Sequence, residues 1–171
     1  MPALTLRPIT DDDLPFLRRL YGTIRAEEMA MVADWTDERK EAFVDQQFAA
    51  QHHWYQEHYT GARFEVVEVD GVPAGRLYVH RRPAEIRLVD ISFLPEFRGR
   101  GLGGSLLRDL LTEGERARKP VTIHVEKYNP ALRLYQRLGF QPIADRGVYW
   151  LLEWVPPGGK SVREGEGDAA R

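Results

Sequence analysis

The sequence predicts a single domain of the α/β (α+β) class, built on a mixed and mostly antiparallel sheet. Three observations support this class. Apolar residues recur with period two in some segments and period 3.6 in others, so strands and helices are both expected. The Asp70-Gly71 dipeptide between two apolar segments indicates a hairpin of antiparallel strands. The segment "FRGRGLGGSLL" separates a strand from a helix that leads to another strand, which makes one βα unit beside the antiparallel hairpins.

The N-terminal third is expected to be mostly helical after one short strand. Leu4 and Leu6 alternate with polar residues, as in a strand. Thr10 precedes three aspartates, and an N-cap followed by acidic residues favours the start of a helix. That first helix has apolar residues at helical spacing: Leu14, Leu17, Tyr21 and Ile24. A second helix is expected from about Asp37 to Tyr59. One face of it should carry Val44, Phe48, Gln51 and Tyr55.

The middle and C-terminal parts alternate strands with two further helices. Strands are predicted at Phe64–Val69 and Pro73–His80, then over "EIRLVDISFL" up to Pro95. A helix from about Gly101 to Arg116 is followed by the strand "VTIHVE" and a helix over Pro130–Leu138 that Gly139 ends. Strands around 140–144 and 148–154 complete the predicted order β-α-α-β-β-β-α-β-α-β-β.

Composition limits the function classes. The 171 residues are 43% hydrophobic and 29% charged, which is typical of a globular domain. A formal net charge of −2 predicts no general attraction to nucleic acid or to an anionic membrane. Without an apolar run long enough to span a membrane, or a signal peptide in the first ten residues, a cytoplasmic location is expected. The absence of cysteine excludes disulfides, thiolate metal sites and a cysteine acyl-enzyme.

The folded domain is expected to cover residues 1–155. The remaining segment, 156–171, reads "PPGGKSVREGEGDAAR" and has no apolar face to bury. It is therefore predicted to be a disordered tail whose removal leaves the melting temperature nearly unchanged.

The glycine-rich loop matches two phosphate-binding patterns. Gly99, Gly101 and Gly104 satisfy G-x-G-x-x-G, which binds dinucleotides, and Glu126 lies near the distance at which an acidic residue would hold a ribose. Arg98, Gly101 and Gly103 satisfy R-x-x-G-x-G, which cradles the pyrophosphate of coenzyme A. Both patterns place backbone N–H groups at a helix N-terminus, where the dipole favours an anion.

Three features favour coenzyme A over NAD. Residues 95–98 separate the strand from the first glycine, whereas a Rossmann turn enters its glycine directly from the strand. An antiparallel hairpin precedes this strand, where a dinucleotide fold needs further βα units. Arg98 and Arg100 suit a ligand with more phosphate charge than NAD, such as coenzyme A with its 3′-phosphate.

The segments "ISFLPEFRGRGLGGSLLRDLL" and "VEKYNPALRLYQRLGFQPI" resemble motifs A and B of the GCN5-related N-acetyltransferase (GNAT) superfamily. The resemblance implies a GNAT fold with a splayed parallel pair of strands, and acetyl-CoA as cosubstrate without a metal. It assigns the pyrophosphate to the loop, the pantetheine arm to two strand residues and an asparagine, and the thioester sulfur to a tyrosine. The implied cofactor-binding residues are Ile91, Phe93, Arg98, Gly99, Arg100, Gly101, Leu102, Gly103, Gly104, Ser105, Asn129 and Tyr135.

The same resemblance implies direct transfer of an acetyl group to a primary amine of a small molecule or peptide. Tyr135 is the expected donor to the leaving thiolate, and the absence of cysteine favours a ternary complex. Arg87 occupies the place where some members of the family carry a glutamate base, and it cannot serve as one. Asp90 is favoured as the base, with Glu126 or a chain of water molecules as alternatives. A non-catalytic acyl-CoA-binding or sensor module is the alternative function.

The acceptor side is the least specified part. The segment "QHHWYQEHY" could supply a wall of the acceptor pocket through His52, Tyr55 or Tyr59, although packing against the sheet is favoured for each of them. A metal site is not expected there, because His53 and His58 lie about 140° apart around a helix. The sequence leaves open the acceptor amine, a longer acyl donor and the oligomeric state, a homodimer included.

Overall fold

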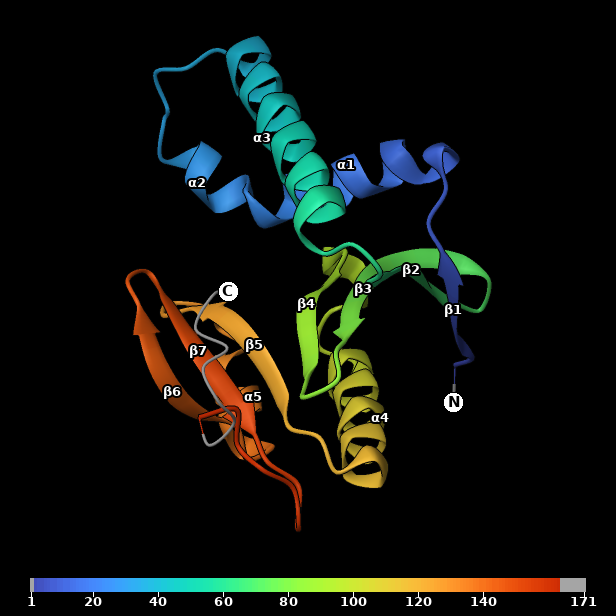
Figure 1. Ribbon diagram of the computed structural model, residues 1–171. Coiled ribbons are helices and arrows are strands. Elements are labelled where there is room, and N and C mark those ends of the chain that lie inside the picture. Colours follow the sequence, from blue (N-terminus) through green and yellow to red (C-terminus); the bar gives the residue numbers. More distant parts are fainter. Residues whose placement is uncertain (1, 164–171) are drawn as a thin grey trace. The chain divides into compact units, whose positions relative to one another are not determined.

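The computed structural model describes residues 2–163, which form two compact units (Figure 1). The first unit comprises the chain up to Leu77 together with Ile91–Arg98. The second comprises Tyr78–Asp90 and the chain from Gly99 onward. Two strands, β3 (Val72–Arg81) and β4 (Ile86–Phe93), contribute residues to both units. Within the described residues, seven strands are hydrogen-bonded in the order β1-β2-β3-β4-β5-β7-β6, which confirms the predicted mixed sheet.

In the first unit, the first two strands pair with each other, and a tight turn follows the second of them. β1 (Leu4–Pro8) pairs antiparallel with β2 (Arg63–Val69), with Leu4 opposite Val69. Asp70 and Gly71 follow β2 with φ of 51° and 80°, the two positive values that a type I′ hairpin turn requires. The Asp70 carboxylate also accepts a hydrogen bond from the Ala3 N–H at 2.9 Å. The predicted hairpin is confirmed.

The first helical segment of the first unit begins with a capping box. Thr10 and Asp13 cap the 3-10 turn Asp11–Asp13, and α1 (Leu14–Ile24) follows directly. α3 (Asp37–His58) starts at Thr36, whose hydroxyl accepts from the Arg39 N–H at 3.1 Å. Between them lies α2 (Ala26–Ala30), which was not predicted because five residues are too few to show a helical period.

α1 and α3 pack together through the apolar residues that the helical spacing places on their facing sides (Figure 1). Leu17 and Tyr21 from α1 and Val44 and Phe48 from α3 are all buried. The Tyr21 and Phe48 rings lie 5.9 Å apart between centroids. The predicted helix faces are therefore confirmed at their central positions, while Ile24 remains 40% exposed at the end of α1.

The second unit is organised around β5 (Val121–Glu126). β5 runs parallel to β4 and antiparallel to β7 (Tyr149–Trp154), and β6 (Gln141–Arg146) completes the hairpin with β7. The parallel register joins Ile86–Leu88 to Val121–Ile123. β4 extends to Phe93 and β5 to Glu126, beyond these three pairs.

The two faces of this part of the sheet differ in character. Ile86, Leu88, Val121 and Ile123 alternate along β4 and β5 and are buried. α4 (Leu102–Ala117) packs closely at Gly114, where a Cβ would lie 2.9 Å from the Lys119 carbonyl and 3.2 Å from Val121. The intervening strand residues, together with Glu85 just before β4, are polar yet mostly buried: Glu85, Arg87, Thr122 and His124. α5 (Leu132–Arg137) connects β5 to the final hairpin.

The described part of the predicted tail, residues 156–163, has specific contacts. Glu153 on β7 is 5% exposed, and its carboxylate accepts hydrogen bonds from the Ser161 hydroxyl at 2.6 Å and the Val162 N–H at 2.7 Å. Arg163 donates to the carbonyl of Ile143 on β6. The composition did not indicate these contacts, because they use polar groups rather than an apolar face. Residues 164–171 lie outside the described residues.

Candidate functional site

The glycine-rich loop presents backbone donors at the start of α4. Gly99 and Gly101 have φ of 74° and 78°, a conformation that side chains with a Cβ rarely adopt. Gly101 is the N-cap of α4, with no side chain capping the helix, and its carbonyl accepts the Ser105 N–H at 3.0 Å. The N–H groups of Leu102, Gly103 and Gly104 therefore precede the first helical hydrogen bond. This end of α4 can bind an anion through N–H donors and the helix dipole.

The packing around the loop does not itself require glycine at several of these positions. A Cβ at Gly99 or Gly101 would meet nothing within 4 Å. A Cβ at Gly104 would meet only the flexible guanidinium of Arg108, at 3.4 Å or more. The positive φ values explain why glycine occupies positions 99 and 101. At position 104, glycine leaves the surface of the helix without a side chain. The open surface of the loop is suited to the close approach of a ligand.

Arg98 and Arg100 differ in their surroundings. The Arg98 guanidinium donates to the Phe93 carbonyl at 2.8 Å and to the Thr23 hydroxyl at 3.3 Å, so it ties the turn after β4 to α1 within the first unit. Arg100, in the second unit, is exposed. Because the Phe93 carbonyl already accepts from Arg98, hydrogen bonding of this strand to a ligand depends on its remaining main-chain groups, those of Ile91 included.

In the second unit, the structure brings Tyr135 and Asp90 close enough to interact electrostatically. Tyr135, on α5, is 3% exposed, and its ring packs edge-on against Phe140 at 5.6 Å. Burial raises the pKa of the Tyr135 hydroxyl, and the negative charge of Asp90 raises it further. The hydroxyl therefore stays protonated through the neutral range, and residues 2–163 supply no hydrogen-bond partner for it. It is a protonated donor held next to a carboxylate.

Asn129 and Glu126 lie in the turn that joins β5 to α5. The Asn129 side-chain oxygen accepts the Ala131 N–H at 2.8 Å, and the Asn129 N–H donates to the Glu126 carbonyl at 2.9 Å. This turn leaves the amide nitrogen of the exposed Asn129 side chain as a donor. The Glu126 side chain, at the end of β5, is exposed as well.

Arg87 is held in a buried polar network. Its side chain is 4% exposed and donates to the Thr122 hydroxyl at 2.8 Å and to His124 Nδ1 at 3.2 Å. Glu85 lies 3.6 Å from the same guanidinium and also accepts from Arg82 at 2.9 Å. No base therefore stands at the position where some GNAT members carry a glutamate. The sequence reasoning missed this network, although its polar residues alternate along both strands.

His124 is a neutral donor rather than a base. Burial, together with the positive charges of Arg87 and Arg146, lowers its pKa to about 4. Since an arginine can only donate, His124 Nδ1 must accept the hydrogen bond from Arg87, which leaves the proton on Nε2. With one nitrogen occupied and the other protonated, His124 cannot take a proton from an amine.

The aromatic and histidine residues from His52 to Tyr59, at the C-terminal end of α3, mostly pack against other side chains. His52 stacks on Phe48 at 5.8 Å, and burial is the main cause that lowers its pKa. The Tyr55 ring lies 5.8 Å from the guanidinium of buried Arg76 and 6.1 Å from the Tyr59 ring. Within residues 2–163, no group of three or more potential ligands could hold a metal ion, and no helix is long and apolar enough to cross a membrane.

Comparisons with known proteins agree with the motifs. The sequence profile of the Acetyltransferase (GNAT) family matches residues 28–140. A protein of Bacillus subtilis named as a ribosomal protein bS18-alanine N-acetyltransferase is 31% identical over 104 residues, which cover 55% of this chain and 68% of the relative.

Solved structures share the fold. The PaiA N-acetyltransferase of Thermoplasma acidophilum, in complex with coenzyme A, has a TM-score of 0.67 at 14% identity, covering 90% of this chain and 99% of that chain. An acetyltransferase of Thermus thermophilus has a TM-score of 0.62 at 21% identity, covering 90% of this chain and 97% of that chain.

Proposed function

Because the chain belongs to the GNAT acetyltransferase family, we propose that it transfers the acetyl group of acetyl-CoA to a primary amine of a small molecule or peptide. The observation that carries this proposal is the open N-terminus of α4. It combines two glycines with positive φ, an N-cap without a side-chain cap, and the spacing R-x-x-G-x-G in a family whose cosubstrate is acetyl-CoA.

The pyrophosphate is proposed to bind the N–H groups at the start of α4. Leu102, Gly103 and Gly104 supply the first-turn donors, and the hydroxyl of Ser105 lies one residue further on. Several N–H donors aimed at one anion, at the positive end of a helix of 16 residues, bind it without a dedicated cation. Arg100 adds a positive charge beside them.

Acetyl transfer requires the removal of a proton from the acceptor. A free alkylamine has a pKa of about 10.4, so at neutral pH it is protonated and cannot attack. Asp90 is proposed to accept that proton, directly or through water, while the amine nitrogen attacks the thioester carbonyl carbon. The carbon–sulfur bond then breaks, and the electron pair leaves with the sulfur as a thiolate. The acceptor remains acetylated without an intermediate on the protein.

Tyr135 is proposed to assist the departure of the thiolate. Its hydroxyl is protonated, and the Tyr135 side chain as a whole is 3% exposed, so a hydrogen bond to the developing negative charge on sulfur is made beside buried protein, where it is stronger than in water. The neighbouring Asp90 carboxylate makes full loss of the phenolic proton harder. The geometry therefore favours hydrogen-bond donation over complete proton transfer.

The acceptor class is supported by the Bacillus relative. Its name gives an alanine of a ribosomal protein as the group that is acetylated, which is an amine on a polypeptide. Peptide amines should therefore be tested as acceptors alongside the amines of small molecules.

Two measurements test the proposal. The first compares stabilisation by coenzyme A in Gly101→Val and Gly71→Val. Both glycines have φ near 80° with open space around a Cβ, so the two variants carry a similar backbone strain. Only Gly101→Val should lose the rise in melting temperature. If coenzyme A raised the melting temperature of both variants equally, the assignment of this loop to the pyrophosphate would be wrong.

The second measurement follows free thiol release from acetyl-CoA with a panel of diamines, amino-sugar amines and peptides beginning with alanine. At least one amine should give turnover above hydrolysis. Coenzyme A binding without thiol release on any of them would favour the non-catalytic acyl-CoA-binding module.

A further inference from the structure

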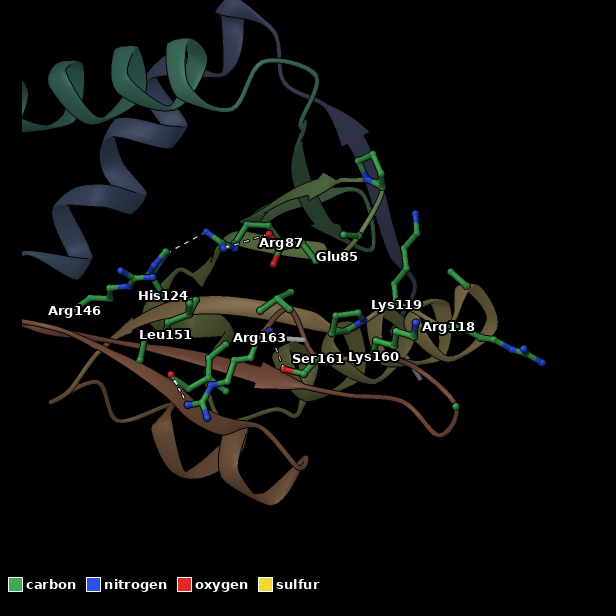
Figure 2. Close-up of a pocket in the computed structure, with 18 residues that line it drawn as sticks. Glu85, Arg87, Arg118, Lys119, His124, Arg146, Leu151, Lys160, Ser161 and Arg163 are labelled. Atoms are coloured by element: carbon green, nitrogen blue, oxygen red, sulfur yellow. Dashed lines mark hydrogen bonds and ion pairs between the residues drawn. The ribbon is translucent and has the colours of Figure 1, made fainter. Parts of the chain in front are cut away.

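A cavity of about 680 Å³ lies within the second unit, on the polar face of β4 and β5 (Figure 2). Its lining comes from the 83–85 segment, β4, the 117–120 segment, β5, β6, β7 and the chain after β7, at Gly158 and residues 160–163. None of the lining residues belongs to the glycine-rich loop, and neither Asn129 nor Tyr135 is among them. This cavity is therefore separate from the residues that the family motifs assign to acetyl-CoA.

The lining is strongly cationic although the protein has a net charge of −2. The lining residues include one with a carboxylate, Glu85, and six with basic side chains: Arg87, Arg118, Lys119, Arg146, Lys160 and Arg163. Clustered cations in a concave site focus positive potential and attract anions. The positive charges of Arg87 and Arg146 contribute to the low pKa of His124, which also lines the cavity. This pKa is consistent with a positive potential there.

Three of the cations are available to a ligand. Arg118, Arg146 and Lys160 are exposed and form no ion pair within the residues the structure describes. By contrast, Arg87 is fixed in the buried network, and the Lys119 ammonium donates to the Arg82 carbonyl at 3.0 Å. A site with fixed hydrogen-bond donors at its base and mobile cationic side chains at its rim can recognise anionic groups of a ligand.

The cavity also has apolar walls and neutral donors. Pro83, Ala84, Ile143, Leu151 and Val162 supply apolar surface. His124 carries its proton on Nε2, because Nδ1 accepts from Arg87. An inorganic ion would leave the apolar walls unused. An organic molecule bearing several anionic groups matches both parts of the lining.

We propose that this cavity binds a small organic polyanion, carrying phosphate or carboxylate groups, at a site distinct from that of acetyl-CoA. Recognition rests on Arg146 and Lys160, with Arg87 and His124 at the base. β4 and β5 carry both Arg87 and His124 and, further along, Asp90 and Glu126. A bound polyanion would therefore contact the same two strands that hold the proposed carboxylates.

The test is isothermal titration calorimetry with the full chain saturated with coenzyme A, which occupies the phosphate loop. Citrate probes carboxylates and inorganic tripolyphosphate probes phosphates. One molecule of at least one probe should bind per chain, with a dissociation constant below about 1 mM at physiological salt. A probe bound only in the absence of coenzyme A would belong to the α4 N-terminus and would overturn the proposal.

Charge-reversal variants locate the site. Arg146→Glu/Lys160→Glu should weaken binding at least tenfold, since it replaces two rim cations by carboxylates. Arg63→Glu/Arg116→Glu makes the same change in net charge at exposed positions outside the cavity and should leave the affinity within about twofold. Equal losses in both variants would mean non-specific attraction and would refute the site.

Should the charge reversal prevent folding, the neutral variant Arg146→Gln/Lys160→Gln replaces it, with a loss of at least threefold expected. Because binding is read as heat rather than as acetyl transfer, this result is independent of the proposed function. A chain without acetyltransferase activity can still bind the polyanion, and an active chain can fail to bind it.

Discussion

The second unit contains two polar regions that are built in opposite ways. At the start of α4, backbone N–H groups are left without partners by the local conformation of Gly99 and Gly101. On the polar face of β4 and β5, charged side chains are buried and bonded to one another, as Arg87 is to Thr122, His124 and Glu85. The first region has donors ready for a ligand, whereas most donors of the second already have protein partners. Catalytic function is therefore expected to depend on the first region and stability on the second.

The largest expected effect is on catalysis at Tyr135. Tyr135→Phe keeps the ring and its contact with Phe140 but removes the hydroxyl. The single-turnover rate of acetyl transfer should fall roughly 10- to 10⁴-fold, with little change in the affinity for acetyl-CoA. The melting temperature should hardly change, because the described residues give this hydroxyl no hydrogen-bond partner. If the single-turnover rate did not change, Tyr135 would have a purely structural role.

A large effect on stability is expected at Arg87. Arg87→Met leaves the buried Glu85 with one guanidinium fewer and the Thr122 and His124 acceptors unfilled, which should cost about 3 kcal/mol in urea unfolding. Arg81→Met is the control, since it removes a half-exposed pair with Glu113 that should be worth less than about 1 kcal/mol. Equal losses in the two variants would show that the network does not stabilise the fold.

A smaller effect is expected from shortening the chain. Truncation after Val155 removes both donors to the buried Glu153 carboxylate and should cost about 1–3 kcal/mol of unfolding free energy. Truncation after Arg163 keeps these donors and serves as the matched control, with no measurable loss expected. If both truncations leave the melting temperature unchanged, the composition-based prediction for 156–171 is right for the whole segment.

The final prediction concerns the pH dependence of stability, where the effect is small within any one pH unit. His124 has a pKa near 6.5 when unfolded and about 4 when folded, so the folded chain binds fewer protons between these values. Its contribution is fully present above pH 6.5 and is lost as the pH falls toward 4. His124→Gln should reduce the loss of unfolding free energy by at most about 1.4 kcal/mol per pH unit in this window.

The comparison with the wild type isolates His124. His52 and His80 also have lowered pKa values, caused mainly by burial, but they are present in both proteins. Identical slopes for the two proteins between pH 6.5 and 4 would mean that Arg87, Arg146 and burial do not keep His124 neutral.

The features that the sequence predicted correctly are those governed by neighbouring residues. Asp70-Gly71 predicts its hairpin because only a few residue types adopt two consecutive positive φ values. Thr10 and Asp13 cap one helix start through contacts three residues apart. The glycine loop is similar, since the conformation of Gly101 and the uncapped first turn of α4 follow from local sequence. The glycine loop is also part of the first of the two family motifs, which is why the family could be identified from the sequence.

The tertiary structure alone decided the contacts between segments that are distant in the sequence. The proximity of Asp90 to Tyr135 depends on β4 and α5, and the bonds of Glu153 to Ser161 and Val162 depend on the chain turning back after β7. Arg98 was predicted to bind coenzyme A, and the structure adds contacts that the sequence did not indicate: its guanidinium donates to the Phe93 carbonyl and to the Thr23 hydroxyl. A polar side chain can be satisfied by many partners, and only the packed fold selects among them, because burial makes each unfilled donor or acceptor costly.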